Sequence, residues 1–347
     1  MFEFLNYCSR RIVNIWYKSD ETSDEIFEAN ILIKKILFLH GQMVSLRQSG
    51  STSEIGDLFS ELRLICIRSV DDRILENPRI LEVISDLRGF CSDIETNLEK
   101  EWGLKAAGDE SSTQEEVCAR IRAYPYFETY VRLIRAELSA MQSVKMEPIK
   151  KIAFIGSGAM PLTSLCLIGR LTDTPTNISI LNVDRDAEGL EISKTICERL
   201  GSKAQGMEFC LAEAGSSLEL YDYDAVYLAA LVGTTQEQKE DLLEQVTSKM
   251  RPGALLVTRG GRKLRSLIYT VRTFQNNSKY KYGRRLCKKL THSVKVFDPT
   301  TERVSKILDM AAVINPQKHN IVNSVFVGQV KPKSPSSGST EVEEAKE

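Results

Sequence analysis

The pattern of hydrophobic and polar positions divides this chain near residue 148. Before that point, apolar residues recur every three or four positions in the stretches 26–40, 55–65 and 80–98, which is the spacing of amphipathic helices. The segment Glu76–Pro78 has the character of a helix start, with proline at a first-turn position. The pattern therefore predicts an all-helical N-terminal half.

From Lys151 onward, short apolar runs alternate with amphipathic stretches, which is typical of a parallel sheet flanked by helices. The predicted strands are Lys151–Ile155, Ile178–Val183, Glu208–Leu211, Ala225–Leu231, Ala254–Thr258 and Val322–Val327. The predicted helices between them are Leu162–Leu171, Ala187–Leu200 and Gln236–Met250.

The length of 347 residues suits two domains, at about 150 residues per domain. We expect a helical N-terminal domain over 1–147 and an α/β domain over 148–330. The stretch 331–347 consists mainly of Lys, Pro, Ser, Gly and Glu, so it is predicted to be a disordered tail.

Composition and charge narrow the class of partner. The chain has 46 Lys and Arg against 47 Asp and Glu, a net charge of −1, so neither nucleic acid nor an acidic membrane is an expected partner. The apolar run near the start is interrupted by Lys34 and Lys35, and no secretory leader is recognisable. We expect a cytoplasmic protein that acts on a small molecule; a weak transit peptide is the alternative. The sequence does not predict the oligomeric state.

The eight cysteines include no C-x-x-C pair, and the chain has only three histidines. Metal sites usually combine closely spaced Cys and His, so no metal site is expected. Reduced, inert thiols are the expectation.

A glycine turn follows the first predicted strand. Gly156, Ser157 and Gly158 precede a predicted helix, so their backbone amides are expected to approach a nucleotide-like ligand; a plain tight turn is the alternative. Asp184 ends the second strand, where a carboxylate can accept both hydroxyls of a ribose. Pro161 stands where a dinucleotide fingerprint has its third glycine. An adenosine ligand without pyrophosphate is therefore favoured, and S-adenosylmethionine fits best.

Most folds that bind this ligand transfer its methyl group. Amine methyltransferases usually carry a polar, proline-containing segment after the fourth strand. Here Leu228–Gly233 holds no polar side chain and no proline. Methyl transfer to nitrogen is therefore not supported.

Five segments together resemble the nicotianamine synthase family. They are Tyr124–Tyr130, Phe154–Gly158 with Pro161–Ser164, Tyr223–Gly233, Pro252–Arg259 and Ile321–Val325, so the similarity spans roughly 25–330. The resemblance implies an α/β fold with a Rossmann-like sheet of the S-adenosylmethionine-dependent methyltransferase type and an N-terminal all-helical cap domain.

The resemblance also implies the reaction. Three S-adenosylmethionine molecules are condensed by aminocarboxypropyl transfer into nicotianamine, a metal chelator, and three S-methyl-5'-thioadenosines are released. S-adenosylmethionine is then the substrate, and no other cofactor is expected. Orientation decides which carbon of the sulfonium reacts, and a base must take a proton from the attacking amine.

The family's catalytic glutamate aligns with Glu99, and its tyrosine partner aligns with Tyr130. Glu95, one helical turn earlier, is the second choice for the base. Spacing alone instead favours a solvated run over Glu99–Glu101. If Glu99 is a base, burial is expected to raise its pKa from the ordinary value of about 4.3.

The ligand contacts that the resemblance implies come from both halves of the chain. We expect the glycine turn and Asp184 to hold the adenosine, Tyr126 to form a chamber wall, and Arg259 to hold a substrate carboxylate. A core role for Tyr126 and a surface role for Arg259 are the alternatives. The implied binding residues are Tyr126, Gly156, Ser157, Gly158, Pro161, Asp184, Glu213, Leu231 and Arg259.

Two departures from the family affect substrate detail. Glu213 stands where the family usually has an aspartate at the adenine edge, and 260–263 reads Gly-Gly-Arg-Lys. A basic stretch at about 270–296 has no acidic residue; a surface loop, a contact for an anionic partner and a gene-model error are the three interpretations.

The alternatives are a methyltransferase on the same fold, a non-catalytic S-adenosylmethionine-binding protein, and an NAD-dependent oxidoreductase. The sequence leaves open the number of condensation rounds and the first acceptor amine.

Overall fold

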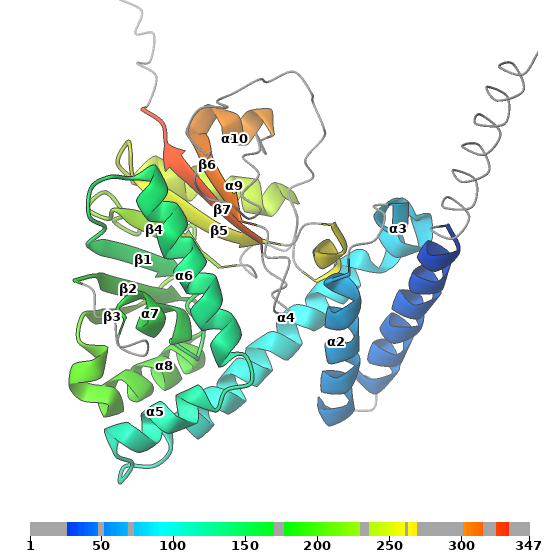
Figure 1. The fold of residues 1–347 in the computed structure, drawn as a ribbon, viewed down its shortest axis with the longest axis horizontal. Helices are drawn as coiled ribbons and strands as arrows, with labels where there is room; N and C mark the ends of the chain where they lie inside the picture. Colours follow the sequence, from blue (N-terminus) through cyan, green and yellow to red (C-terminus); the bar gives the residue numbers. More distant parts are fainter. Residues whose placement is uncertain are drawn as a thin grey trace, which may run out of the picture.

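The computed structural model describes residues 26–47, 52–68, 73–169, 177–229, 236–260, 263–268, 301–314 and 324–332. The N-terminal part is helical, as the spacing predicts (Figure 1). It contains a helix over 26–47, then α2 (Thr52–Cys66), α3 (Arg73–Glu76) and the long α4 (Pro78–Ala107). Helix α4 begins where Asn77 and Pro78 predict a start, because the Asn77 side chain accepts the Arg79 N–H at 3.0 Å.

The sheet has seven strands in the order β3-β2-β1-β4-β5-β7-β6. Strands β1 to β5 are parallel, and β7 runs antiparallel between β5 and β6. This order is that of Rossmann-like S-adenosylmethionine-dependent methyltransferase sheets, so the predicted fold class is confirmed. The strands are β1 (Lys151–Ile155), β2 (Ser179–Asp184), β3 (Met207–Leu211), β4 (Ala225–Leu228), β5 (Leu255–Gly260), β6 (Leu308–Ile314) and β7 (Ser324–Val330).

Helices cover both faces of the sheet (Figure 1). Helix α8 (Ala187–Leu200) has the predicted bounds, whereas α7 (Leu162–Leu167) ends four residues before the predicted Leu171. The helices of this part are α5 (Gln114–Arg122), α6 (Phe127–Val144), α7 (Leu162–Leu167), α8 (Ala187–Leu200), α9 (Gln236–Lys249) and α10 (Glu302–Ile307), with the 3-10 turns η1 (Gly201–Ala204) and η2 (Lys263–Leu267).

Strand β6 was not predicted. Its only β-branched residues, Val313 and Ile314, stand at its end after a central Met-Ala-Ala, and its pairing with β7 shifts register between Met310 and Ala312. The pairing with β7, rather than local propensity, therefore makes this segment a strand.

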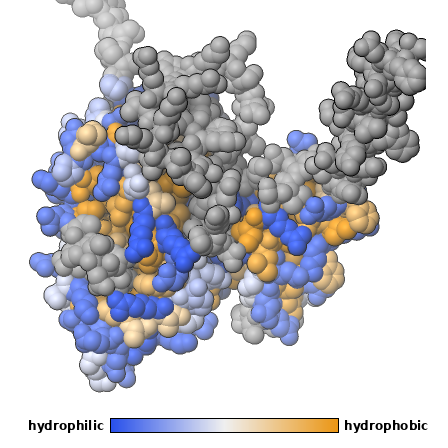
Figure 2. All heavy atoms as spheres, viewed as in Figure 1, coloured by the Kyte–Doolittle hydropathy of each residue, from blue (hydrophilic) through white to orange (hydrophobic). Residues whose placement is uncertain are grey.

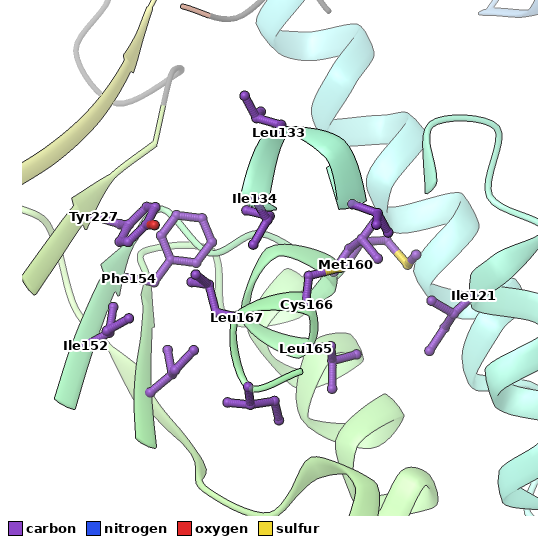
Figure 3. Close-up of a cluster of buried hydrophobic side chains, with 14 of the residues drawn as sticks. Ile121, Leu133, Ile134, Ile152, Phe154, Met160, Leu165, Cys166, Leu167 and Tyr227 are labelled. Atoms are coloured by element: carbon purple, nitrogen blue, oxygen red, sulfur yellow. The ribbon is translucent and has the colours of Figure 1, made fainter. Parts of the chain in front are cut away.

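Helix α4 belongs to two hydrophobic cores. Its first half, including Leu87 and Phe90, packs with the N-terminal helices and with Leu264 and Leu267 of η2. Its last turn, including Ala106, packs with α5, α6 and the sheet in a second core. Figure 3 shows part of that second core, including Phe154, Tyr227, Ile134 and Leu167. The domain boundary at 147/148 stays a prediction. The two hydrophobic cores, however, separate earlier in the chain, within α4.

Two predicted segments lie at positions that the structure does not describe. The basic stretch at about 270–296 lies outside the described residues, as does the tail from 333.

None of the described helices is long and apolar enough to cross a membrane. In Figure 2, hydrophilic side chains cover much of the described surface, and apolar ones also show on the N-terminal helices, where Phe27 and Phe38 are more than half exposed.

Candidate active site

A cavity of about 1040 Å³ lies at the carboxyl ends of the parallel strands. Ligands of open α/β sheets bind at this edge, where the strand order reverses between β1 and β4. The wall opposite the sheet comes from one face of α4, and a further wall comes from α9. The lining side chains of these two helices are Ser92, Glu95, Thr96, Glu99 and Lys100 on α4 and Gln238, Asp241, Leu242 and Gln245 on α9.

The glycine turn after β1 lines the cavity as predicted, but its amides are used inside the protein. Gly156 and Gly158 have φ angles of 80° and 70°, which only glycine adopts readily. The N–H groups of Gly156 and Ser157 both donate to the Val183 carbonyl, at 2.8 and 3.1 Å. The Gly158 N–H donates to Asp184 Oδ2 at 2.7 Å. The expectation that these amides hold the ligand is therefore corrected: all three N–H groups already donate within the protein, so the turn presents no free backbone donor to the cavity.

The Ser157 hydroxyl differs from the amides of its turn. The side chain is buried and lines the cavity, and its Oγ has no hydrogen-bond partner in the described part of the chain. A buried hydroxyl without a partner is costly, so a ligand group in the cavity is a natural partner for it.

Asp184 is oriented by the backbone around it. One carboxylate oxygen accepts the Gly158 N–H, and the other accepts the Asp186 N–H at 3.0 Å. Each carboxylate oxygen has a further lone pair, so both can still accept a ligand hydroxyl. Asp184 lines the cavity, which is the position that ribose recognition requires.

Glu99 reaches the sheet from α4. A Cβ atom on Gly158 would overlap Oε2 of Glu99, so the carboxylate fills the space that glycine leaves at the turn. The side chain is partly buried and lines the cavity. Glu99 is therefore not part of a solvated run, although its neighbour Glu101 is exposed.

The surroundings of Glu99 favour its protonated form. Burial is the main cause that raises the pKa of Glu99 to about 8. The carboxylates of Glu95 and Asp184 raise the pKa further, whereas the cation of Arg259 opposes the shift. Such a pKa is suited to a group that must accept a proton from an amine near neutral pH.

Lys100 ties α4 to the start of α8 beside the cavity. Its Nζ lies 2.8 Å from Asp186 Oδ2 and 2.6 Å from Glu188 Oε2. Hydrogen bonding to Asp186, and then to Glu188, raises the pKa of Lys100. The lysine next to Glu99 is thus engaged by the α/β part of the chain, which helps to hold the carboxylate over the turn.

Tyr130 lines the cavity from the first turns of α6. Burial, and then the charge of Glu99, raises the pKa of its hydroxyl above the ordinary value, so the tyrosine is neutral. Within the described residues no hydrogen bond joins Tyr130 to Glu99. The two side chains meet at one cavity, and the orienting role of the tyrosine stays a prediction.

Arg259 is buried and lines the cavity, so it is not a surface cation. Its Nε and Nη2 bind the two carboxylate oxygens of Glu137 at 2.8 and 3.0 Å. Its Nη1 donates to Thr163 Oγ1 at 3.1 Å. The expected bidentate hold on a substrate carboxylate conflicts with this pairing, because Glu137 already occupies the fork.

The other predicted residues divide into three groups. Glu213 lines the cavity at the loop after β3. Pro161 and Tyr126 are not among the lining residues; Tyr126 packs against Tyr124, with ring centroids 5.5 Å apart, and lies under the guanidinium of Arg63 at 4.2 Å. Leu231 lies outside the described residues.

The sequence argument missed Glu137 and the lining face of α9. Glu137 is fully buried at a position where the 3.6-residue pattern of α6 calls for an apolar side chain, between Ile134 and Met141. A carboxylate on an apolar face was the available signal, because buried carboxylates are almost always paired. No group of three His, Cys, Asp or Glu side chains in the described ranges is placed to hold a metal ion.

The family model and the known relatives that match this chain agree on one family. The family model described as "Nicotianamine synthase protein" matches residues 24–288. Nicotianamine synthase 9 of Hordeum vulgare is 32% identical over 256 residues, covering 72% of each chain. Nicotianamine synthase 2 of Arabidopsis thaliana is 27% identical over 248 residues, covering 70% of this chain and 75% of the relative.

Solved structures support the fold. A glutamate-to-glutamine mutant of MtNAS in complex with S-adenosylmethionine has a TM-score of 0.65 at 17% identity, over 87% of this chain and 99% of that chain. MtNAS in complex with MTA and tNA has the same TM-score at 16% identity, over 86% and 98% of the two chains. The match of the family model over most of the chain shows that this protein belongs to the nicotianamine synthase family.

Proposed function

We propose that this protein condenses three S-adenosylmethionine molecules into nicotianamine, with Glu99 as the base and Tyr130 as its partner. In each transfer the bond between the sulfonium and the γ-carbon of the amino-acid arm breaks. A carbon–nitrogen bond forms to an amine, one S-methyl-5'-thioadenosine leaves, and one proton is released to the base. Three transfers therefore release three thioadenosines and three protons.

The observation that carries the proposal is the position of the Glu99 carboxylate against the glycine turn. Asp184 and the glycine turn line the same cavity. An S-adenosylmethionine whose ribose is bound by Asp184 therefore has its sulfonium near that turn. An amine that attacks in this cavity meets Glu99. With a pKa of about 8, the carboxylate can take the proton of an ammonium at little cost in free energy.

The charge of the cavity suits cationic substrates. Among the described residues, six acidic side chains line it against three basic ones, and two of the cations are paired: Lys100 with Asp186 and Glu188, and Arg259 with Glu137. Sulfonium and ammonium groups are attracted to such a site, whereas the negative charge opposes anionic ligands. The same acidic lining raises the pKa of Glu99 and so keeps it basic.

Orientation then decides that the aminocarboxypropyl group of S-adenosylmethionine, and not its methyl group, is transferred. The acceptor amine must lie in line with the γ-carbon on the side where Glu99 and Tyr130 meet, and the methyl group must face no nucleophile. S-adenosylmethionine is a substrate in this scheme, and no chemical step calls for a further cofactor.

Product analysis tests the proposal. Purified protein is incubated with S-adenosylmethionine alone, and the products are identified by mass. S-methyl-5'-thioadenosine together with nicotianamine supports the proposal. S-adenosylhomocysteine would instead indicate a methyltransferase, and ligand binding without any product would indicate a binding protein.

A further inference from the structure

A buried ion pair lies beneath the cavity, between α6 and the end of β5. Glu137 has none of its surface exposed and Arg259 only 5%. Their two parallel hydrogen bonds, at 2.8 and 3.0 Å, give the fork geometry of a strong arginine–carboxylate pair. Replacing such a pair by apolar residues is often neutral or stabilising, so the stability of the fold alone does not account for it.

The guanidinium also contacts the aromatic wall of the site. Its central carbon lies 5.8 Å from the ring centroid of Tyr130 and 6.0 Å from that of Tyr227, and its third nitrogen donates to Thr163. Tyr130 and Glu137 lie about two turns apart on the same face of α6. The ion pair therefore fixes α6 to the sheet at the point where Tyr130 enters the cavity.

The pair also contributes charge to the environment of Glu99. The titratable groups that face Glu99 are Glu95 on its own helix, Asp184 after the glycine turn, Arg259 on β5, and the hydroxyls of Tyr124 and Tyr130. Arg259 is the cation of this set, and its charge lowers the pKa of Glu99 against the upward effects of burial, Glu95 and Asp184. Glu137 carries the opposite charge in direct contact with Arg259, so it opposes this effect.

We propose that Glu137 and Arg259 are positioning residues for the proposed reaction: the pair holds Tyr130 in place and sets the field in which Glu99 takes up its proton. The inference rests on the proposed role of Glu99. It also assigns Arg259 to Glu137 rather than to a substrate carboxylate.

Opposite changes of charge at the two positions test the inference. Glu137→Gln leaves the Arg259 cation without its counter-charge, so the pKa of Glu99 falls and the acidic limb of kcat/KM moves to lower pH. Arg259→Gln removes the cation, so the limb moves to higher pH. Each shift is expected to be on the order of one pH unit. The amine of the substrate titrates identically in all variants, so differences between variants report on the enzyme.

Two further variants separate positioning from stability. Arg259→Lys keeps the charge but loses the fork, so it should lower kcat at least tenfold while leaving the limb within about 0.3 pH units of the parent, well below the shift expected for loss of the charge. Asp224→Asn removes a partner of Lys145 and Arg251 at the other end of the sheet. This control should lower the melting temperature without moving the limb.

A titration without turnover keeps the inference separate from the proposed function. Protein carrying ¹³C at the glutamate carboxyl carbons is titrated by NMR, and Glu99→Gln assigns the Glu99 signal. If the parent makes no nicotianamine, the proposed function fails, but the titration still decides whether the pair sets the pKa of Glu99.

Opposite shifts in Glu137→Gln and Arg259→Gln support the inference. Shifts in the same direction, or a fixed pKa with only a lower melting temperature, overturn it. Should Glu137→Gln fail to fold, the contrast between Arg259→Lys and Arg259→Gln decides, because equal limbs in those two variants contradict a role of the charge.

Discussion

The carboxylate of Glu99 on α4 occupies the space in which a Cβ atom of Gly158 would lie. The first residue comes from the helical half and the second from the turn after β1, so neither half holds the candidate site alone. The Gly158 N–H also binds Asp184 at 2.7 Å, which joins the proposed base to the proposed ribose contact through a single residue. This relationship makes Gly158 the most informative position to change.

Gly158→Ala should abolish turnover. The added Cβ displaces the Glu99 carboxylate, and a non-glycine residue at a φ of 70° costs about 1 kcal/mol of stability. Gly253→Ala is the matched control, because Gly253 has a φ of 81° and the nearest atom to its added Cβ is 3.8 Å away. Both variants should lose similar stability in chemical unfolding, and only Gly158→Ala should lose activity. Full activity in Gly158→Ala would contradict the proposed position of the base.

The rate should rise with pH through about 8. Glu99 acts as a base only when ionised, and its pKa is about 8, so kcat/KM falls below that pH. Glu95→Gln removes a carboxylate that raises this pKa, so the acidic limb should move to lower pH while activity persists. The pH profiles of the parent and the variant check this. If Glu95→Gln abolishes activity and Glu99→Gln does not, Glu95 is the base.

Glu99→Gln should lower turnover by about 10² to 10⁴-fold and also stabilise the fold at alkaline pH. In the unfolded chain the carboxyl ionises near its ordinary pKa of 4.5, whereas in the folded chain it keeps its proton up to about 8. The parent therefore loses stability as pH rises from about 5 to about 8, and the neutral amide avoids this loss. Each pKa unit corresponds to about 1.4 kcal/mol, so the gain at pH 9 is on the order of a few kcal/mol.

Urea unfolding of both proteins at pH 5 and pH 9 measures this difference. Glu101→Gln, at an exposed position on the same helix, is the control and should change stability by less than about 0.5 kcal/mol. A stability difference that does not grow with pH would show that the Glu99 pKa is not raised.

Local signals in the sequence predicted much of the fold. Asn77 and Pro78 predict the start of α4 because a helix cap depends only on residues next to it in the sequence. Strand β1 and helix α8 also have the predicted bounds. Strand β6 escaped prediction because it depends on pairing with β7, which the segment itself does not reveal.

The candidate site was predictable in part, from residue types at the glycine turn and Asp184 and from the family resemblance at Glu99. The glycine turn, Asp184 and Glu99 were singled out in advance, and the structure brings them together. The partner of Arg259 was not, because an ion pair between α6 and β5 depends on how distant segments pack. For the same reason, no local pattern of residues predicts that the turn amides donate to Val183 and Asp184.

Gly103→Ala should impair activity although it raises helix propensity. Gly103 lies one turn after Glu99 on α4, and an added Cβ would lie 2.7 Å from Ile192 Cγ2 and 3.0 Å from the Ala159 carbonyl oxygen, so α4 would be pushed away from the glycine turn. Gly89→Ala on the same helix meets no atom within 4 Å and should stabilise by about 0.5–1 kcal/mol, the usual gain of alanine over glycine. Melting temperatures and kcat of the two variants decide the matter. Because Ile192 can move at modest cost but the backbone of Ala159 cannot, Gly103→Ala should lose stability and lower kcat at least tenfold; a gain in both would show that α4 need not approach the turn so closely.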